Sequence, residues 1–213
     1  MIPVILGVPR SGTSLCANIL THMGYNFIGN SKTIDPYFPK ILNPDGYFQR
    51  LDLYYLVCSQ MKTDFHKFNV PCQFDQESLN TFQRIYNVMN NQFPNWGLKE
   101  PYLIKFLNDI SSFDNILFIV VYRNPQDTLA SIRKFKTYFP NLHDYNQYDW
   151  KNYYSTFLKK KKQLKLNTVF LSYDELLSHP LKTYQTFYEQ LSKYKRNLKF
   201  LNKECIRNII KTT

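Results

Sequence analysis

The sequence lacks the features that mark secreted, membrane-spanning or metal-binding proteins. Its 4 cysteines show no C-x-x-C spacing, which argues against a zinc site and against a disulfide framework. No apolar run reaches the ~18 residues needed to span a bilayer. The first run, MIPVILGV, is too short for a signal peptide. We therefore expect a cytoplasmic protein with reduced thiols, no membrane span and no bound metal. A lumenal or host-cell compartment is the alternative.

Linkers and acidic residues are also scarce. No Gly/Ser-rich or Pro-rich segment divides the 213 residues, so we expect a single domain over residues 1–213. Only 16 Asp and Glu stand against 27 Lys and Arg, and the formal charge of +11 favours anionic partners. The sequence has no nucleic-acid-binding motif and its aromatic residues are scattered, so nucleic acid is not an expected partner.

Hydrophobic patterns predict strands that alternate with helices. Apolar, β-branched runs predict buried strands at 2–6, 115–123 and 167–173, and a short strand at 96–99. Helical patterns occur at 14–24, 51–62, 76–92, 101–109 and 124–135, and further helices continue to the C-terminus. This alternation predicts an α/β fold of the three-layer P-loop type, in which helices flank a central parallel sheet.

The segment GVPRSGTS, residues 7–14, joins the first predicted strand to the first helix. Gly7 and Gly12 keep the spacing of an ATPase phosphate loop, G-x-x-x-x-G-K-[ST], but Thr13 occupies the lysine position and Arg10 supplies the cation. Backbone N–H groups, a helix N-terminus and a guanidinium form an anion site. The segment predicts a ligand with fewer charges than a triphosphate. An ordinary turn and a variant ATP loop are the alternatives.

A second strand-to-helix junction, YRNPQDTLAS, follows the strongest predicted strand. Arg123 ends that strand at the carboxyl edge of the sheet, where open parallel sheets bind ligands. Ser131 lies about two turns into the next helix, so its hydroxyl is expected to face the same groove. Taken alone, the two residues are also typical of a surface ion pair and of an ordinary helix serine.

The segments GVPRSGTS, GLKEP, YRNPQDTLAS and LSYDELLSHPLKT together resemble, in order and spacing, the sulfotransferase superfamily that uses 3′-phosphoadenosine 5′-phosphosulfate (PAPS). The arginine form of the loop is most similar to the tyrosylprotein and bacterial branches. The resemblance extends from Ile2 to about Leu191. It implies in-line transfer of the sulfuryl group from PAPS to a hydroxyl or amine of a small-molecule, glycan or peptide acceptor. The product is 3′-phosphoadenosine 5′-phosphate (PAP), and no metal is required.

The resemblance also implies roles for individual residues. The PAPS-binding set matches the loop and the second junction, and consists of Pro9, Arg10, Ser11, Gly12, Thr13, Ser14, Arg123 and Ser131. Residues 10–14 of the loop would hold the 5′-phosphosulfate, and Arg123 and Ser131 would hold the 3′-phosphate. Arg10 is also an expected catalytic residue. Lys99 matches the lysine of the family's KDP motif and would neutralise charge on the leaving phosphate. Glu100 replaces the aspartate of that motif and would orient Lys99.

The general base is the part of the family pattern that this sequence lacks. Tyrosylprotein and glycan sulfotransferases carry a glutamate in the loop where this chain has residues 30–32, NSK. Related bacterial sequences read GYFE where this chain reads GYFQ, so Gln49 removes another carboxylate. Asp35 is the first candidate for the base and His66 the second. A non-catalytic relative that binds PAPS or PAP is therefore an alternative, and a small-molecule P-loop kinase is a further one.

Two basic segments also need an interpretation. The RKGxxGDW lid of cytosolic sulfotransferases is absent, and the segment 193–203 is a candidate to cover the adenine instead. The run KKKK, residues 159–162, would go right round a helix. Such a run is usually a solvated surface, and the alternative is a surface that attracts an acidic or sulfated acceptor.

Overall fold

A four-stranded parallel sheet forms the centre of the computed structural model, which describes residues 1–29, 32, 46–61, 71–138, 146–195 and 197–211. The strand order is β2-β1-β3-β4, and each neighbouring pair is parallel. The strands are β1 (Ile2–Leu6), β2 (Leu98–Lys99), β3 (Ile116–Tyr122) and β4 (Thr168–Ser172). All four lie within the predicted runs, and the predicted α/β fold is confirmed.

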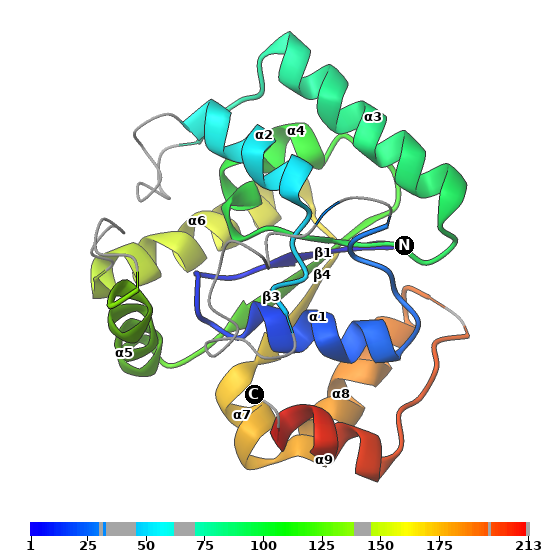
Figure 1. Ribbon diagram of the computed structural model, residues 1–213, viewed down its shortest axis with the longest axis vertical. Helices are drawn as coiled ribbons and strands as arrows, with labels where there is room; N and C mark the ends of the chain where they lie inside the picture. The colour runs from blue at the N-terminus through cyan, green and yellow to red at the C-terminus, as the bar shows by residue number, and fades with distance from the viewer. Residues whose placement is uncertain (30–31, 33–45, 62–70, 139–145, 196, 212–213) are drawn as a thin grey trace.

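Helices cover both faces of the sheet (Figure 1). The upper layer in that view holds α2 (Leu51–Met61), α3 (Gln76–Gln92), α4 (Leu107–Ile110) and α6 (Gln147–Leu164). The lower layer holds α1 (Thr13–His22), α7 (Tyr173–Ser178), α8 (Pro180–Ser192) and α9 (Lys203–Lys211). Helix α5 (Pro125–Lys136) follows β3 and lies at the left of the molecule. None of the helices in the described part of the chain is long and apolar enough to cross a membrane.

The helix predicted over 101–109 begins in a different form. Its first part is the 3-10 helix η3 (Pro101–Phe106), and only the α4 segment after it is α-helical. Glu100 caps η3 by accepting a hydrogen bond from Tyr102 N (3.2 Å). The Pro101 carbonyl, which an α-helix would bond to the Lys105 N–H, accepts a hydrogen bond from the Tyr153 hydroxyl (2.8 Å). This tertiary contact accompanies a departure that local propensity did not predict.

Strand β3 separates two hydrophobic clusters, one on each face of the sheet. Phe118 and Val120 belong to the cluster that includes residues of α2, α3 and α6. Leu117 and Ile119 belong to the cluster that includes residues of α1, α7, α8 and α9. Because successive side chains of a strand point to opposite faces, a strand buried on both faces is apolar throughout. This is why the run ILFIVV shows no alternation.

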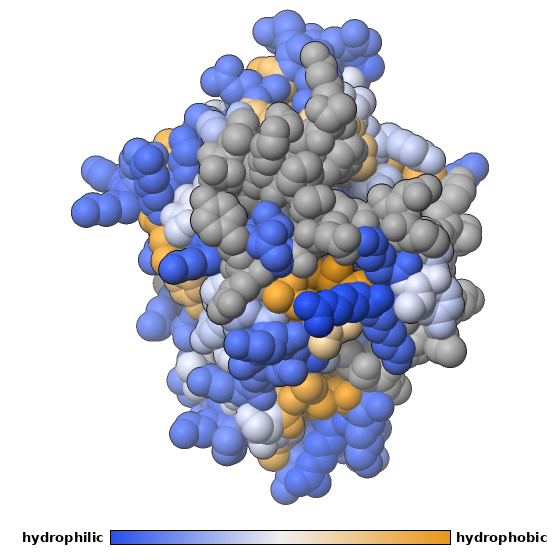
Figure 2. Space-filling view, turned by 90° about the vertical axis from the view of Figure 1, so that its left-hand side faces the viewer, coloured by the Kyte–Doolittle hydropathy of each residue, from blue (hydrophilic) through white to orange (hydrophobic). Residues whose placement is uncertain are grey.

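The carboxyl ends of the strands share one edge, on the left-hand side of Figure 1. The loop after β1, the start of α5 and the start of α7 all lie at this edge. Figure 2 looks onto this side of the molecule, where hydrophilic residues surround smaller hydrophobic areas. The N-terminus lies on the opposite side of the sheet. The fold therefore gathers the two predicted anion-binding segments at one edge.

Candidate active site

The loop between β1 and α1 turns sharply because two of its residues have left-handed backbone conformations. These are Arg10, with φ 71°, and Gly12, with φ 95°. A Cβ atom at position 12 would collide with the Tyr173 ring, so the position requires glycine for space as well as for φ. Gly12 has no side chain to cap α1, and no acidic residue lies in the first turn. The N–H groups at the start of α1 therefore form an anion-binding end.

Two tyrosines of α6 hold this loop against its neighbours. The Tyr153 hydroxyl accepts from Gly7 N (2.8 Å) and donates to the Pro101 carbonyl, so it ties the loop to η3. The Tyr154 hydroxyl donates to the Val121 carbonyl (2.8 Å) at the end of β3. Burial raises the pKa of Tyr154, which keeps it a neutral donor. Neither tyrosine was predicted from the sequence, because aromatic residues in a helix more often signal ordinary core packing.

The Ser11 side chain has a structural contact. Ser11 is fully buried, and its hydroxyl donates to the Val121 carbonyl (3.3 Å). Its N–H donates to the Val8 carbonyl (3.0 Å), which closes the turn. The Ser11 hydroxyl thus contacts the end of β3, and the expected place of Ser11 in the PAPS-binding set stays a prediction.

Arg10 reaches from the loop to α5. Its Nε donates to the Ser131 hydroxyl (3.3 Å), and its guanidinium lies 5.3 Å from the centre of the Phe135 ring. Burial lowers the pKa of Arg10, and the positive charge of Arg123 acts in the same direction. The structure therefore brings together Arg10 and Ser131, two residues that were expected at different phosphate groups.

Arg123 lies beside the same loop and has an unpaired donor. Its guanidinium lies 4.7 Å from the centre of the Tyr173 ring, and Nη1 donates weakly to the Arg10 carbonyl (3.4 Å). The Nε atom is buried without a hydrogen-bond partner, a condition shared among the described residues only by Trp96 Nε1. A buried unpaired donor costs roughly 1–3 kcal/mol. Arg123 therefore fits a site completed by an external acceptor such as a phosphate oxygen.

A second group of side chains, which we call the lysine cluster, consists of Ser14, Tyr47, Gln49, Lys99 and Glu100. Strand β2 pairs with β1 so that Lys99 lies opposite Ile5, and this register brings its side chain to the start of α1. Lys99 Nζ donates to Ser14 Oγ (3.1 Å), the Tyr47 carbonyl (2.7 Å) and Gln49 Oε1 (3.0 Å). Lys99 is thus buried, with its ammonium in contact with the start of α1.

Glu100 lies behind Lys99 and is completely buried. Its carboxylate accepts from Gln49 Nε2 (2.7 Å) and from Tyr102 N (3.2 Å). Burial raises the pKa of Glu100, while these hydrogen bonds oppose that rise. Glu100 was expected to orient Lys99, and the described contacts connect the two through Gln49. The sequence signalled Gln49 only as a missing carboxylate.

The remaining predicted residues either lie outside the described part of the chain or lie away from the loop and the lysine cluster. Asp35 and His66, the two candidates for the general base, lie outside the described residues. Lys195 donates to Asn95 Oδ1 (2.5 Å), just before β2 and therefore at the amino ends of the strands. Lys195, in the segment 193–203 that was expected to cover the adenine, thus lies at the edge opposite the loop, because α8 runs back toward that edge.

The lysine run 159–162 also lies away from the loop. It forms the end of α6, which leads into the amino end of β4 at the edge opposite the loop. Lys160 Nζ donates to Asn108 Oδ1 (2.9 Å), and Lys161 lies over the Phe170 ring (5.3 Å). The run therefore goes around the helix, with two of its lysines against neighbouring segments.

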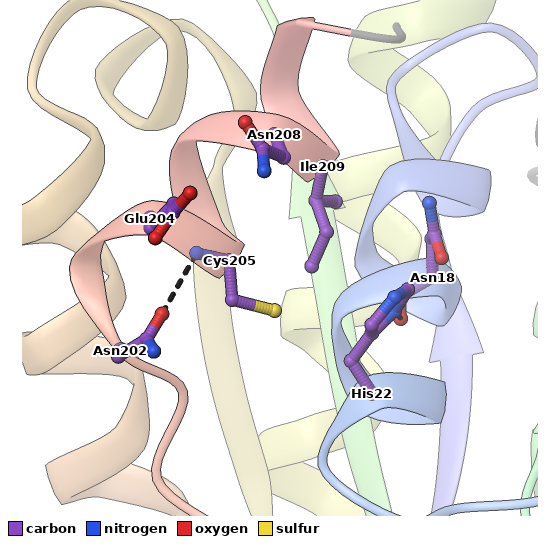
Figure 3. Close-up of a pocket in the computed structure, with 7 residues that line it drawn as sticks. All are labelled: Asn18, His22, Asn202, Glu204, Cys205, Asn208 and Ile209. Carbon is purple, nitrogen blue, oxygen red and sulfur yellow. Dashed lines mark hydrogen bonds between the residues drawn. The ribbon is translucent and has the colours of Figure 1, made fainter.

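A pocket of about 560 Å³ lies between α1 and α9. Asn18 and His22 of α1 face Cys205 and Ile209 of α9 across it (Figure 3). None of the residues predicted to bind PAPS lines this pocket. Among the described residues, no three or more His, Cys, Asp or Glu side chains are placed to hold a metal ion. All four cysteines are free thiols.

Comparison with known proteins agrees with this arrangement. The model of the sulfotransferase family matches residues 4–193, which include the loop, the lysine cluster and the Arg123 junction. The chain belongs to the sulfotransferase family. Its fold is similar to that of the sulfotransferase domain from the curacin biosynthetic pathway, with a TM-score of 0.53 and 20% identity over 94% of this chain and 75% of that chain. No curated protein gives a significant match to this sulfotransferase.

Proposed function

We propose that this sulfotransferase transfers the sulfuryl group of PAPS to a hydroxyl or amine by in-line displacement and releases PAP. The observation that carries the proposal is the buried, unpaired Nε of Arg123. It lies beside the loop before α1, in which Arg10 and Gly12 have left-handed backbone conformations. PAPS supplies a sulfuryl group on a phosphate leaving group. We also propose that residues 1–213 form a single domain, because both hydrophobic clusters pack on one sheet.

Two anion subsites are proposed for the nucleotide. Arg123 and Ser131 hold the 3′-phosphate, and the Arg10 guanidinium lies close enough to contribute, since it already contacts Ser131. The 5′-phosphosulfate lies at the start of α1, where the N–H groups and the hydroxyls of Thr13 and Ser14 are the available donors. Charge-assisted hydrogen bonds of this kind are roughly twice as strong as neutral ones. The proposed set therefore recognises two separated anionic groups.

Lys99 is the proposed group that stabilises charge on the leaving phosphate. Lys99 is 3% exposed, and its ammonium contacts Ser14 at the start of α1. In a buried site, water screens the field of the ammonium less than it does at the surface. A fixed cation at the position where negative charge develops lowers the barrier without needing to reorganise.

The acceptor is proposed to be a small molecule, a glycan or a peptide. Asp35 is the first proposed base and His66 the second. A second function, binding of PAPS or PAP without turnover, is favoured by one observation: at the position of the GYFE carboxylate, the Gln49 amide contacts Lys99. An amide cannot take a proton from the acceptor. This second function would be supported if PAP binds without turnover on any acceptor and if Asp35→Ala and His66→Ala bind PAP as the wild type does.

The test is a calorimetric titration with PAP, ADP and ATP in EDTA, repeated for ATP with magnesium in place of EDTA, for the wild type and for Arg123→Ala. We expect PAP to bind more tightly than ADP by ~1.5–3 kcal/mol, the value of hydrogen bonds to a charged group. Arg123→Ala should remove that margin and leave ADP binding nearly unchanged. Arg133→Ala, which alters an exposed arginine of the same helix α5 as Ser131, is the control and should behave as the wild type.

Two results would contradict the proposal. Equal affinity for PAP and ADP would remove the 3′-phosphate site. Binding that appears only with ATP and magnesium would instead favour the small-molecule kinase, in which Thr13 replaces the usual lysine.

A further inference from the structure

The Gln49 side chain connects two buried charged groups that are adjacent in the sequence. Its Oε1 accepts from Lys99 Nζ (3.0 Å), and its Nε2 donates to Glu100 Oε2 (2.7 Å). An ammonium can only donate and an ionised carboxylate can only accept, so the two partners fix the orientation of the amide. All three side chains are less than a tenth exposed. Gln49 is thus a hydrogen-bonded bridge inside the lysine cluster.

The neutrality of this bridge affects the field of Lys99. A carboxylate in direct contact with the ammonium would cancel much of the positive potential that reaches Ser14 and the loop. With the amide between them, the carboxylate of Glu100 is bound by Gln49 and by Tyr102 N. Burial raises the pKa of Glu100, while the hydrogen bonds from Gln49 and Tyr102 N and the positive charge of Lys99 act in the opposite direction. The carboxylate and the ammonium both contact the Gln49 amide, which lies between them.

We propose that Gln49 is a positioning residue: its amide holds the Lys99 ammonium against Ser14 and keeps the Glu100 carboxylate from neutralising it. The inference rests on the proposed function, because the charge of Lys99 is useful only if a leaving phosphate lies beside it. It also gives the glutamine a role of its own. A carboxylate at position 49 would be a direct counter-ion to Lys99.

Among the described residues, the titratable groups that face Glu100 are Lys99 of β2 and Tyr54 and Cys58 of α2. Tyr54 and Cys58 are neutral near physiological pH. Burial raises the pKa of Cys58 to about 12, and burial also raises the pKa of Tyr54. In the described surroundings, the carboxyl at position 100, and any carboxyl placed at position 49, are therefore the groups that change charge between acidic and neutral pH.

The first experiment measures hydrolysis of PAPS to PAP and sulfate, in which water receives the sulfuryl group and loses a proton. Gln49→Met keeps the approximate size of the side chain and removes both hydrogen bonds. We expect the maximal rate to fall by about tenfold or more, because Lys99 loses one of its constraints. PAP affinity, measured by calorimetry, should stay within about threefold, since Gln49 does not belong to the anion subsites.

The matched control for this variant is Gln60→Met. Gln60 lies in α2, and its Nε2 also donates to a carboxylate, that of Asp75 (3.2 Å), but at an exposed position away from Lys99. The control should hydrolyse PAPS at the wild-type rate.

A second experiment separates positioning from a merely structural role. The double exchange Gln49→Glu with Glu100→Gln keeps the net charge and restores a complementary donor and acceptor between the two positions. It places the carboxylate directly on Lys99. We expect thermal stability to recover relative to Gln49→Glu alone, while the hydrolysis rate stays about tenfold or more below the wild type.

The pH profile provides the readout that a structural role would not change. In the single Gln49→Glu variant, two neighbouring carboxyls share a proton at low pH and lose it as the pH rises. The hydrolysis rate of this variant should therefore show a new pH-dependent step that is absent from the wild type, Gln49→Met and Gln60→Met.

The outcomes of these experiments distinguish an error in the role of Gln49 from an error in the proposed function. A wild-type rate in Gln49→Met or in the double exchange, with PAP binding intact, would overturn this inference and leave the proposed function standing. A wild-type protein that does not distinguish PAP from ADP would overturn the proposed function, and the inference with it.

Discussion

The loop and the lysine cluster lie side by side at the carboxyl edge of the sheet, yet they are built in different ways. The loop is one continuous stretch whose shape depends on two left-handed residues and on backbone N–H groups. The lysine cluster combines side chains from α1, from the segment before α2 and from β2. One site is therefore encoded locally, and the other exists only when three segments pack together.

The two regions also differ in what a substitution can remove. Backbone donors persist whatever side chain is present, so the loop is sensitive mainly at positions where space or φ is limiting. In the lysine cluster each side chain is the partner of another, and both charges are buried. Removing one member leaves its neighbours unpaired, which costs more than the loss of the bond itself. We therefore expect larger functional losses in the lysine cluster and mainly stability losses around the loop.

The largest expected effect is that of Lys99→Ala. The substitution removes the buried cation and leaves Gln49 Oε1 without its ammonium donor. PAPS hydrolysis should fall about 10²–10³-fold, the range typical for loss of one charge-stabilising group. Steady-state rates and PAP calorimetry would be measured together.

Two controls sharpen this prediction. PAP affinity should change by less than about tenfold, because Arg123 and Ser131 remain. Lys105→Ala removes another buried lysine, which lies in η3. This variant should lower the stability of the fold, but its hydrolysis rate should fall much less than that of Lys99→Ala once both rates are corrected for any change in PAP binding. An equal loss of rate in the two variants would show that burial, rather than position, explains the effect.

A smaller effect is expected for Tyr153→Phe, which tests how the loop is held. The variant keeps the ring but removes the hydroxyl that links Gly7 N to the Pro101 carbonyl. Because a buried N–H loses its acceptor, we expect a loss of about 1–3 kcal/mol in unfolding free energy, measured by urea denaturation. Weaker PAP binding should accompany it.

The control for this substitution is Tyr188→Phe, which removes a single hydroxyl contact, to the Leu198 carbonyl (3.0 Å), in the lower layer. It should cost less stability and leave PAP binding unchanged. If both variants lose the same stability and PAP affinity, the Tyr153 hydroxyl does not support the loop in particular.

The smallest expected effect is the pH dependence of Glu100→Gln. Burial raises the pKa of Glu100 above its ordinary value of 4.5, so the folded state holds this proton more tightly than the unfolded state does. The contribution of Glu100 is complete below the ordinary pKa and is lost as the pH rises through the raised pKa. The loss is about 1.4 kcal/mol for each unit by which the pKa is raised.

Urea denaturation at several pH values would measure this difference. A protonated carboxyl resembles an amide in having a donor and an acceptor, so wild type and Glu100→Gln should match at low pH. Above the raised pKa, the variant should be relatively more stable. Glu189→Gln is the control, because Glu189 also accepts from a glutamine, Gln185, but is exposed on α8. A constant difference at all pH values would contradict the assignment.

The sequence predicted the scaffold more fully than the contacts. The buried strands could be predicted because they are apolar on both faces. The start of helix α5 could be predicted because Asn124 caps the helix and Pro125 is its first residue, as the structure shows. The 3-10 form of η3 was not predicted, because it accompanies a hydrogen bond from Tyr153 of a distant helix. The base candidates Asp35 and His66 stay predictions.

By itself, the sequence determined the order of strands and helices along the chain, the sharp loop at Gly12 and the resemblance that pointed to a sulfotransferase. These follow from local spacing, since hydrophobic period, glycine position and helix caps act over a few residues. Only the tertiary structure decided that Arg10 meets Ser131, that Arg123 has a buried unpaired Nε and that Gln49 separates Lys99 from Glu100. These contacts join residues far apart in the chain, and they arise because the packed sheet and helices bring those segments within hydrogen-bond distance.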